Sequence, residues 1–260
     1  MDTKHRNICI DADMGEALGP YNTGQDEALM PLVTSANIAC GFHAGDPLVM
    51  ARSVELAQQH GVCIGAHPGF DDLRGFGRRR MTMPAREVEY MVTYQIGALK
   101  ALAEARGAKV EYVKPHGALN NMAHEDPELA DAIARGIRAA GRDLLFVANC
   151  LSEMVAAGER AGLQVLHEAY ADRHYMPDGR LMPRSRADAV IRDAEEAAER
   201  TLRMLEAQEL AALDGTRLPS RIDTFCIHGD EPTAIAIARV IRARCAAMGV
   251  MPKTVTELAA

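Results

Sequence analysis

The stretch Ser35–Met81, SANIACGFHAGDPLVMARSVELAQQHGVCIGAHPGFDDLRGFGRRRM, decides the fold of this chain. An apolar run at residues 37–40 predicts a short buried strand, and His43 follows shortly after it. A segment with helical spacing comes next, and a second apolar run at residues 62–66 leads directly to His67. Each histidine therefore stands where a predicted strand ends.

Aspartate followed by proline marks the start of two predicted helices, at Asp46 and at Asp126. An aspartate side chain can accept hydrogen bonds from the first free N–H groups of a helix, and proline suits the first helical position because it has no N–H. We interpret both aspartates, and Glu231 before the last predicted helix, as capping or helix-dipole residues rather than as catalysts.

Apolar runs and helical segments alternate along the rest of the chain. The predicted strands are residues 8–10, 37–40, 62–66, 110–113, 144–147, 164–168 and 224–227. The predicted helices are residues 25–32, 47–59, 82–107, 127–141, 152–161, 187–208 and 232–248. This alternation favours parallel strands joined by right-handed crossovers.

Polar residues gather where the predicted strands end, and this decides between two parallel architectures. The residues concerned are Asp11, Asp13, His43, His67, Lys114, His116, Glu168, Asp172, His228 and Asp230. An open, doubly wound sheet binds its ligand at one switch point between a few strands. Here at least six strand ends contribute, which is typical of the catalytic face of an α/β barrel. We therefore predict a seven-stranded parallel β/α barrel, with residues 1–260 forming a single domain.

Composition excludes several classes of protein. With 48% hydrophobic and 25% charged residues, the chain resembles ordinary globular proteins, and it has no apolar run near the roughly 18 residues of a membrane span. The first residues, MDTKHRN, lack the apolar core of a signal peptide, so we expect a cytoplasmic protein. A net charge of −7 argues against nucleic-acid binding. The six cysteines form no C-x-x-C pair and are expected to be buried free thiols.

Four of the nine histidines, His43, His67, His116 and His228, share one context: an apolar run before them and a glycine close by. We expect them to form one site. Lys114 ends an apolar run and should point into the barrel mouth, where a buried lysine is costly unless it is paired or functional.

Asp11 and Asp13 lie two residues apart on a predicted strand and so share one face. Carboxylates that close should raise the pKa of one of them, which suits a general base or a metal ligand; capping of a loop is the alternative. Arg173 next to Asp172 can clamp a substrate carboxylate with two parallel hydrogen bonds, or simply form a local ion pair.

Several longer motifs add a resemblance to a known family. They are Asp13-Met-Gly-Glu16, Ser35-Ala-Asn-Ile-Ala-Cys-Gly-Phe-His-Ala-Gly-Asp46, Gly65-Ala-His-Pro-Gly69, Gly75-Phe-Gly-Arg-Arg79, Tyr94-Gln-Ile-Gly-Ala-Leu99, Lys114-Pro-His-Gly-Ala-Leu119, Ala171-Asp-Arg173 and His228-Gly-Asp230. Over residues 7–250 the chain resembles the LamB/YcsF family. The resemblance implies a barrel of the glycoside hydrolase/deacetylase type. It also implies a part in the ATP-dependent hydrolytic opening of 5-oxoproline (pyroglutamate) to L-glutamate, together with the B and C subunits of a 5-oxoprolinase.

The expected roles combine the resemblance with the residue chemistry. The chain has neither a phosphate loop nor a strand-following Gly-x-Gly-x-x-Gly, so ATP is expected to bind with or on the partner subunits. Asp13 is the first candidate for the general base, and Lys114, His116 and His43 are candidates for stabilising negative charge or protonating the leaving nitrogen. Arg173 is the candidate for the substrate carboxylate. The remaining candidates are Asp11, His67 and His228 for catalysis, and Glu16, Asp172, Asp230 and Arg79 for substrate binding. The glycine-rich loop at residues 68–81 is expected to form a flap, with Arg78 or Arg79 reaching the substrate.

Three positions depart from the family pattern: Asp11 replaces an asparagine, Asn120 a tyrosine and Leu151 a glycine. An asparagine both donates and accepts hydrogen bonds, whereas an aspartate carboxylate only accepts. The lactam that is the natural substrate therefore stays open.

Two other functions stay open as well. One is a metal-dependent deacetylase or amidohydrolase that acts alone, because relatives of this fold use an Asp-His-His ion site and these residue types are present here. A divalent metal ion is accordingly a second cofactor to consider, with its ligands unknown. The other is a non-catalytic subunit that only binds the lactam, although binding alone would not need so many ionisable residues on one face.

Overall fold

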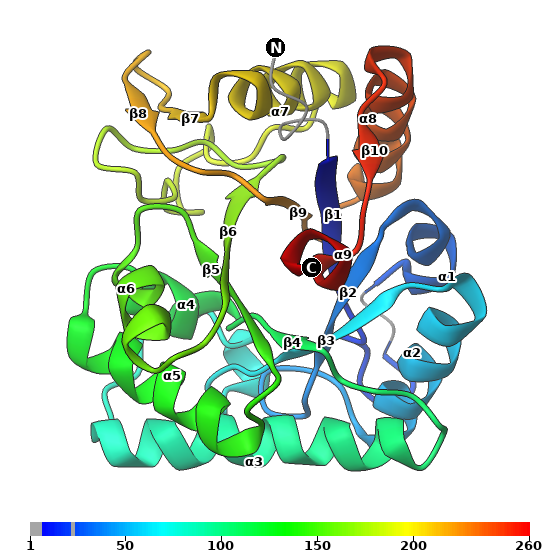
Figure 1. Cartoon of the computed structure of the whole chain (residues 1–260), viewed down its shortest axis with the longest axis vertical. Helices are drawn as coiled ribbons and strands as arrows, with labels where there is room; N and C mark the ends of the chain where they lie inside the picture. The colour runs from blue at the N-terminus through cyan, green and yellow to red at the C-terminus, as the bar shows by residue number, and fades with distance from the viewer. Residues whose placement is uncertain (1–6, 22–23) are drawn as a thin grey trace.

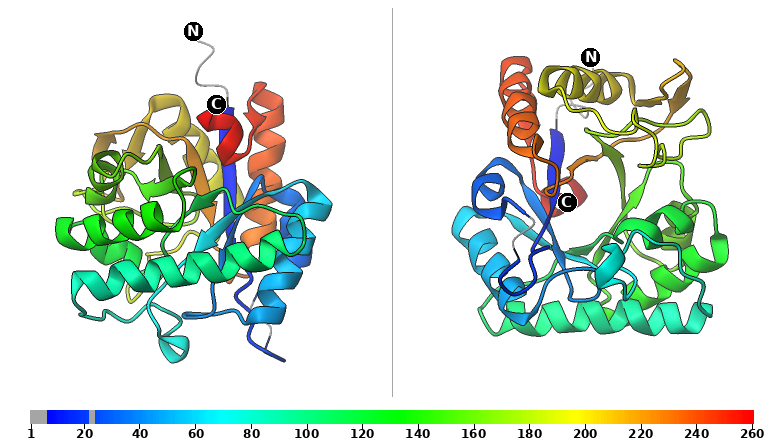
Figure 2. Two further views of the ribbon diagram at one scale, coloured as in Figure 1. Left: turned by 60° about the horizontal axis from the view of Figure 1, so that its bottom comes forward. Right: turned by 180° about the vertical axis from the view of Figure 1, so that it is seen from behind.

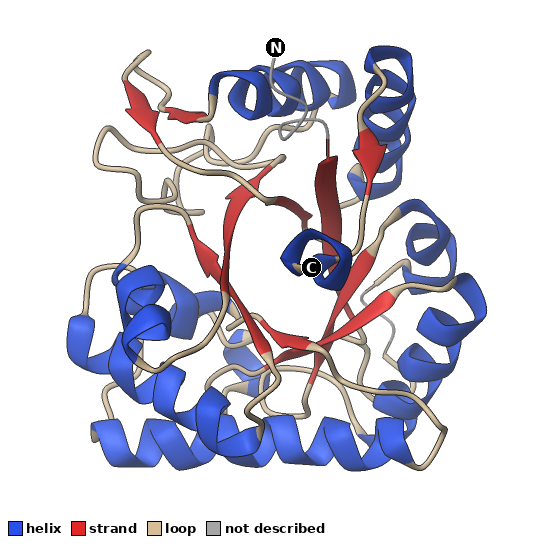
Figure 3. Cartoon of the chain, in the orientation of Figure 1, coloured by secondary structure: helices blue, strands red, loops and turns tan. Residues whose placement is uncertain are grey.

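Seven short parallel strands close into a barrel, and helices surround it, as the sequence predicts (Figures 1 and 3). In the computed structural model of the chain, residues 7–21 and 24–260 are described, so the expectation about the first six residues lies outside them. The barrel strands are β1 (Asn7–Met14), β2 (Ser35–Ala39), β3 (Cys63–His67), β4 (Tyr112–Val113), β5 (Leu145–Asn149), β6 (Val165–Tyr170) and β9 (Thr224–Ile227). They pair in this order, and β9 pairs back with β1 to close the ring.

Successive side chains along each strand point alternately to the surrounding helices and to the barrel interior. Ile10 and Ala12 on β1 belong to the main hydrophobic core, whereas Asp11 and Asp13 face the interior. Towards the amino ends of the strands, the interior is filled by a separate small cluster of buried residues: Cys9, Cys63, Tyr112, Val147, Leu166 and Val255. The polar residues therefore lie above an apolar floor.

One glycine allows a close approach inside the barrel. A Cβ atom at Gly65 would lie 2.2 Å from the ring of Tyr112, so a larger residue at this position would displace that ring. With glycine there, Tyr112 is completely buried and its hydroxyl reaches Oδ1 of Asn37 at 2.7 Å.

The end of the chain closes the barrel at the amino ends of the strands. Strand β10 (Met251–Pro252) pairs with the start of β1, and helix α9 (Val255–Ala259) begins with a capping box between Thr254 and Glu257. Figure 1 shows the C-terminus over the centre of the barrel. The sequence pattern predicted a last helix ending at residue 248 and missed both elements, because each is too short to show a period.

Helices cover the outside of the barrel, with their apolar faces towards the strands (Figures 2 and 3). They are α1 (Asp26–Leu29), α2 (Pro47–His60), α3 (Ala85–Glu104), α4 (Gly117–Ala123), α5 (Pro127–Ala140), α6 (Glu153–Arg160), α7 (Ala194–Ala207) and α8 (Ala234–Met248), with short 3₁₀ turns η2 (Met30–Leu32) and η3 (Leu73–Gly75). Asp46 and Asp126 cap α2 and α5 through their side chains, as predicted. The described residues include no helix that is both long and apolar enough to cross a membrane.

Two local predictions were wrong, and a short helix and a hairpin were not foreseen. The helix expected from Ala187 begins at Ala194, because residues 187–193 are held in an irregular path: the N–H of Ile191 donates to the carbonyl of Asp172 at 2.9 Å. Helix α8 begins after Thr233, and Glu231 pairs with Arg184 at 2.6 Å instead of capping it. Helix α4 and the antiparallel hairpin of β7 (Glu209–Ala211) and β8 (Arg217–Pro219) were not foreseen. The six cysteines are buried free thiols, as expected.

Candidate active site

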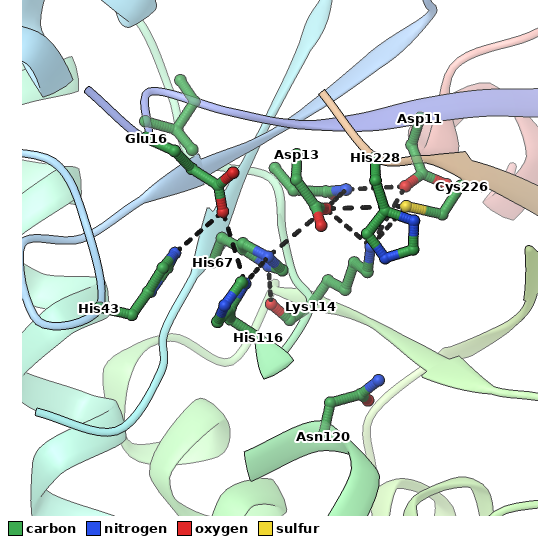
Figure 4. Close-up of polar contacts among 12 residues, drawn as sticks. Asp11, Asp13, Glu16, His43, His67, Lys114, His116, Asn120, Cys226 and His228 are labelled. Carbon is green, nitrogen blue, oxygen red and sulfur yellow. Dashed lines mark hydrogen bonds and ion pairs between the residues drawn. The ribbon is translucent and has the colours of Figure 1, made fainter. Parts of the chain in front are cut away.

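A cavity of about 560 Å³ opens at the carboxyl ends of the barrel strands. Six residues selected from the sequence line it: Asp13, His67, Lys114, His116, Arg173 and His228. They come from five of the seven barrel strands or from the residues that directly follow them. The strand ends therefore bring these side chains together around one cavity, and Figure 4 shows all of them except Arg173.

The other selected residues lie behind the cavity wall or beside it. Glu16 and His43 are buried next to His116, and Asp172 is buried next to His228. Asp230 pairs with Arg78 at 2.8 Å, and Arg78 lines the cavity. Arg79 lies outside the lining: its side chain is 65% exposed and pairs with Asp72.

Lys114 is a buried cation at the centre of this site. Its Nζ atom lies 2.8 Å from Oδ1 of Asp13, 3.2 Å from Oε1 of Glu168 and 3.8 Å from Oδ1 of Asp11. Burial acts to lower the pKa of Lys114, but the negative charges of Asp13 and the neighbouring groups outweigh burial and raise it well above its usual value. Lys114 therefore carries a positive charge next to the cavity, as the sequence suggested.

The expected rise in a carboxylate pKa occurs at Glu168 rather than at Asp13. Burial acts to raise the pKa of Asp13, but its interactions with His67 and with the ammonium of Lys114 outweigh burial and hold this pKa well below its usual value. At Glu168, burial together with the charges of Asp11 and Asp13 raises the pKa well above its usual value, although Lys114 opposes this. Asp13 is thus a stable anion and a weak base.

Asp11 shares the interior face with Asp13 but lies one layer deeper, outside the cavity lining. Its oxygens accept hydrogen bonds from the amide nitrogen of Asn37, at 2.7 Å, and from the hydroxyl of Thr224. The same Asn37 nitrogen donates to Asp13 at 3.0 Å. Asn37, which was not selected from the sequence, links the two aspartates; it was detectable as a polar residue within a fully buried strand.

Three histidines and Glu16 form a compact buried cluster (Figure 4). Nδ1 of His116 lies 2.9 Å from Nε2 of His67, and Nε2 of His43 lies 3.1 Å from Oε1 of Glu16. The rings of His43 and His116 stack with their centroids 3.7 Å apart. The ligand atoms of all four residues lie within 4.8 Å of one another, so the cluster can hold a metal ion. A second group of this kind, Asp11, Asp13 and Cys226, surrounds Lys114 and is less suitable, because the ammonium occupies its centre.

The loop at residues 68–81 packs against these histidines. The ring of Phe76 lies edge-on to His43 and His116, with centroids 5.8 and 5.4 Å away. Gly77 has φ of +62°, and a Cβ atom there would lie 2.6 Å from Cβ of His43. Glycine at position 77 therefore allows the loop to come close enough for its carbonyl to accept from the N–H of Ala118, at 2.8 Å.

On the other side of the cavity, His228 and Asp172 form a hydrogen-bonded dyad. Nδ1 of His228 lies 2.9 Å from each carboxylate oxygen of Asp172, and the ring stacks on Tyr170 with centroids 5.3 Å apart. Burial acts to raise the pKa of Asp172, but the charge and hydrogen bond of His228 outweigh it and lower this pKa. Such a carboxylate orients the imidazole and supports a positive charge on it.

The arginines around the cavity differ in how fully they are paired. Arg173 donates to the backbone carbonyls of Ala189 and Met182, at 3.2 and 2.5 Å, so part of its guanidinium is already used. Arg184 also lines the cavity, and its buried Nη2 has no hydrogen-bond partner among the described residues. Sequence reasoning missed Arg184 because it lies in an irregular segment with no periodic pattern.

Two departures from the family pattern have visible consequences. Asn120 lines the cavity and donates to Oδ1 of Asn149 and to the hydroxyl of Tyr170, both at 3.1 Å. The tyrosine usual at position 120 would be larger and would fill part of this space. Leu151 has φ of +62°, a conformation that favours glycine, which explains why glycine is usual there.

Comparisons with known proteins agree with the resemblance. A protein from Methylococcus capsulatus, named as the A subunit of 5-oxoprolinase, is 50% identical over 245 residues, which cover 94% of each chain. One with the same name from Gluconobacter oxydans is 44% identical, over 96% of this chain and 99% of that protein. The crystal structure of a lactam utilization protein from Thermus thermophilus superposes with a TM-score of 0.89 at 44% identity, covering 95% of this chain and 99% of that one.

A more distant structure, the catalytic domain of a peptidoglycan N-acetylglucosamine deacetylase from Eubacterium rectale, shares only the fold. Its TM-score is 0.53 at 10% identity, over 97% of this chain and 90% of that domain. A model of the LamB/YcsF family matches residues 8–260. With the close relatives covering nearly the whole chain, this match shows that the chain belongs to the LamB/YcsF family.

Proposed function

We propose that this chain is the A subunit of a 5-oxoprolinase, which opens 5-oxo-L-proline to L-glutamate with ATP and with partner B and C subunits. The names of the close relatives support this proposal, because they match at 44–50% identity over at least nine-tenths of both chains. The observation that carries it is the cavity itself, where a buried cation, Lys114, lies among carboxylates and opposite the His228–Asp172 dyad. A reaction that consumes ATP also fits the predicted cytoplasmic location.

The chemistry explains why ATP and partner subunits are needed. A five-membered lactam is a stable amide, and phosphorylation of its oxygen would turn it into an activated, imidate-like electrophile. The chain has no phosphate-loop motif, so we assign ATP binding and activation to, or together with, the partner subunits. We assign to this chain the pocket for the lactam and the step in which water adds to the activated ring carbon. The ring C–N bond then breaks as the nitrogen takes up a proton, and hydrolysis of the resulting acyl phosphate by a second water releases phosphate and L-glutamate.

We assign the general base to His228 rather than to Asp13. Asp13 accepts hydrogen bonds from Lys114 and Asn37, and its low pKa makes it a poor acceptor of a further proton. His228 lines the cavity, and Asp172 holds its Nδ1, which leaves Nε2 to take the proton from water. Asp13 then has a different role: it positions Lys114, whose ammonium stabilises the negative charge that develops on oxygen as water attacks the lactam carbon.

For the carboxylate of the substrate we propose Arg184 together with Arg173. Both line the cavity, and Arg184 has a buried N–H group without a partner among the described residues. An unpaired buried donor is costly, so a bound carboxylate would stabilise this arrangement. Arg173 alone is the weaker candidate, because backbone carbonyls use part of its guanidinium.

The test is a reconstituted reaction of this chain with purified B and C subunits, in which both ADP and glutamate are measured. We expect His228→Gln and Lys114→Met to lower glutamate formation at least about 100-fold, the size typical of one catalytic group. The matched controls are His60→Gln and Lys109→Met, at exposed positions far from the cavity lining. Normal glutamate formation by both cavity variants would exclude the proposed site.

A metal-dependent amide hydrolase acting alone is the second candidate function, and the cluster of Glu16, His43, His67 and His116 favours it. When bound, such an ion would supply Lewis-acid chemistry next to the cavity. Amide hydrolysis by the isolated chain without ATP would support this candidate.

A lactam-binding role without catalysis is tested by single turnover: the isolated chain would then fail to hydrolyse an activated lactam that it binds.

A further inference from the structure

Two backbone carbonyls fix which ring nitrogen carries the proton in His67 and in His116. Nδ1 of His67 lies 2.7 Å from the carbonyl oxygen of Lys114, and Nε2 of His116 lies 2.8 Å from that of Phe76. A carbonyl oxygen only accepts, so each of these nitrogens must donate its hydrogen. In the neutral rings, Nε2 of His67 and Nδ1 of His116 are therefore the nitrogens with free lone pairs.

These two lone pairs point at each other. The two nitrogens are 2.9 Å apart, a hydrogen-bond distance, yet neither neutral ring has a hydrogen to place between them. Carboxylates flank the same spot: Oδ1 of Asp13 is 3.4 Å from Nε2 of His67, and Oε1 of Glu16 is 3.5 Å from Nδ1 of His116. Lone pairs and carboxylate oxygens that converge in a buried place favour a cation.

A metal ion meets this requirement better than an extra proton does. A proton would create an imidazolium in a buried place, stacked 3.7 Å from the ring of His43, where its charge would be away from water. Metal binding, by contrast, uses neutral rings and places the positive charge on the ion, between the two lone pairs and the carboxylates.

We propose that Nε2 of His67, Nδ1 of His116 and the carboxylate of Glu16 bind one divalent transition-metal ion of the zinc class. His43 positions Glu16 by donating from Nε2 at 3.1 Å. His67 and His116 line the cavity, so the ion would have an open coordination position facing it. The distant deacetylase establishes only the fold, so the assignment rests on these contacts.

Distances between the ligand atoms fit such an ion. Nitrogen and oxygen ligands lie about 2.0–2.2 Å from zinc, so ligand atoms 2.9 and 3.5 Å apart would enclose angles of roughly 90–110° at the metal. These two angles are within the range of tetrahedral and octahedral coordination, and small rotations of the two rings would turn both lone pairs towards the ion. The two carbonyl contacts are also the outer hydrogen bonds that commonly orient metal-binding histidines.

The experiment uses the untagged chain alone, treated with a chelator and titrated with Zn²⁺ by calorimetry and with Co²⁺ by visible absorption. We expect one equivalent of each ion to bind and Co²⁺ to give d–d bands. His67→Gln, His116→Gln and Glu16→Gln should each weaken binding by about 100-fold or more, since even changes to groups that only orient a ligand cost about 10–100-fold. His60→Gln, at an exposed histidine at the end of α2, should bind as the wild type does.

Nitrogen-15 NMR of the wild-type imidazoles gives a second readout that does not depend on the folding of any variant. Zn²⁺ should shift the resonances of Nε2 of His67 and Nδ1 of His116 and leave their partner nitrogens protonated. The proposal is overturned if neither ion binds, if the ligand variants bind as tightly as the wild type, or if the spectrum shows a proton between the two rings that Zn²⁺ does not displace. No ATP, lactam or B and C subunits are used, so this result is independent of the proposed 5-oxoprolinase function.

Discussion

Both carboxylate oxygens of Asp172 lie 2.9 Å from Nδ1 of His228, and the ring of His228 lines the cavity. Asp172 follows β6 and His228 follows β9, two strands that are neighbours in the barrel although 56 residues separate the two side chains along the chain. The barrel therefore brings together a base and the group that orients it.

This relationship predicts the effect of Asp172→Asn. An asparagine can offer its NH₂ group to the imidazole, which favours the wrong tautomer, and it removes the charge that supports protonated His228. We expect kcat for glutamate formation in the reconstituted enzyme to fall about 10²- to 10⁴-fold with a small change in KM. Asp131→Asn, on the outer helix α5, is the control. An unchanged kcat would remove the dyad from the mechanism.

The same substitution should also change how the unfolding free energy of the protein depends on pH. The pKa of Asp172 in the folded protein is below the ordinary aspartate value of 3.8. The ionised Asp172 therefore stabilises the folded protein above the unfolded-state pKa, and this stabilisation is lost as the pH falls through the folded-state pKa. Asp172→Asn should therefore cost about 1–3 kcal/mol of unfolding free energy at pH 7, and the difference from wild type should shrink below about pH 4. Urea unfolding over a pH series measures this. A difference that stays constant down to about pH 3 would contradict the assigned direction.

Asp11→Asn restores the residue usual in the family. The charge of Asp11 contributes to the raised pKa of Glu168, so its removal should lower that pKa and shift the pH profile of turnover towards lower pH. We also expect turnover of 5-oxoproline to improve. If the pH profile, the response to divalent ions and the preference among lactams all stay the same, this departure from the family is silent.

Leu151→Gly should stabilise the protein. Leu151 is 45% exposed and has a positive φ, which costs a non-glycine residue about 1–2 kcal/mol. Glycine removes this strain but loses more backbone entropy on folding, by about 0.5–1 kcal/mol. We expect a net gain of about 0.5 kcal/mol, measured by urea unfolding, with unchanged activity. A loss of stability would mean that the packing of the leucine side chain outweighs the strain.

Sequence patterns were sufficient to predict the barrel and six of the residues that line the cavity, because these depend on the local order of residues along the chain. Each barrel strand is a short apolar run, and the polar residue that follows it, such as His67 or His228, must lie at the same end of the barrel as the others. Five of the six predicted residues in the cavity lining were found in this way, and Arg173 was selected because it is next to Asp172.

Sequence patterns could not predict contacts between residues that are far apart along the chain. The low pKa of Asp13 depends on His67 and on Lys114, which is 101 residues away, so the spacing between Asp11 and Asp13 could not predict it. Residues 187–193 have a helical composition, but hydrogen bonds to the segment after β6 hold them in another path. Arg184 lies in that irregular region, where neither a helical nor a strand period could point to it.

The most direct test of the central claim follows both products in one reaction of this chain with B and C subunits, ATP and 5-oxoproline. For the wild type we predict that glutamate and ADP form in step. For His228→Gln we predict that glutamate formation falls at least about 100-fold, while His60→Gln behaves as the wild type. Glutamate formed at the wild-type rate by the His228→Gln mixture, or by B and C subunits without this chain, would contradict the claim that the lactam ring is opened in this cavity.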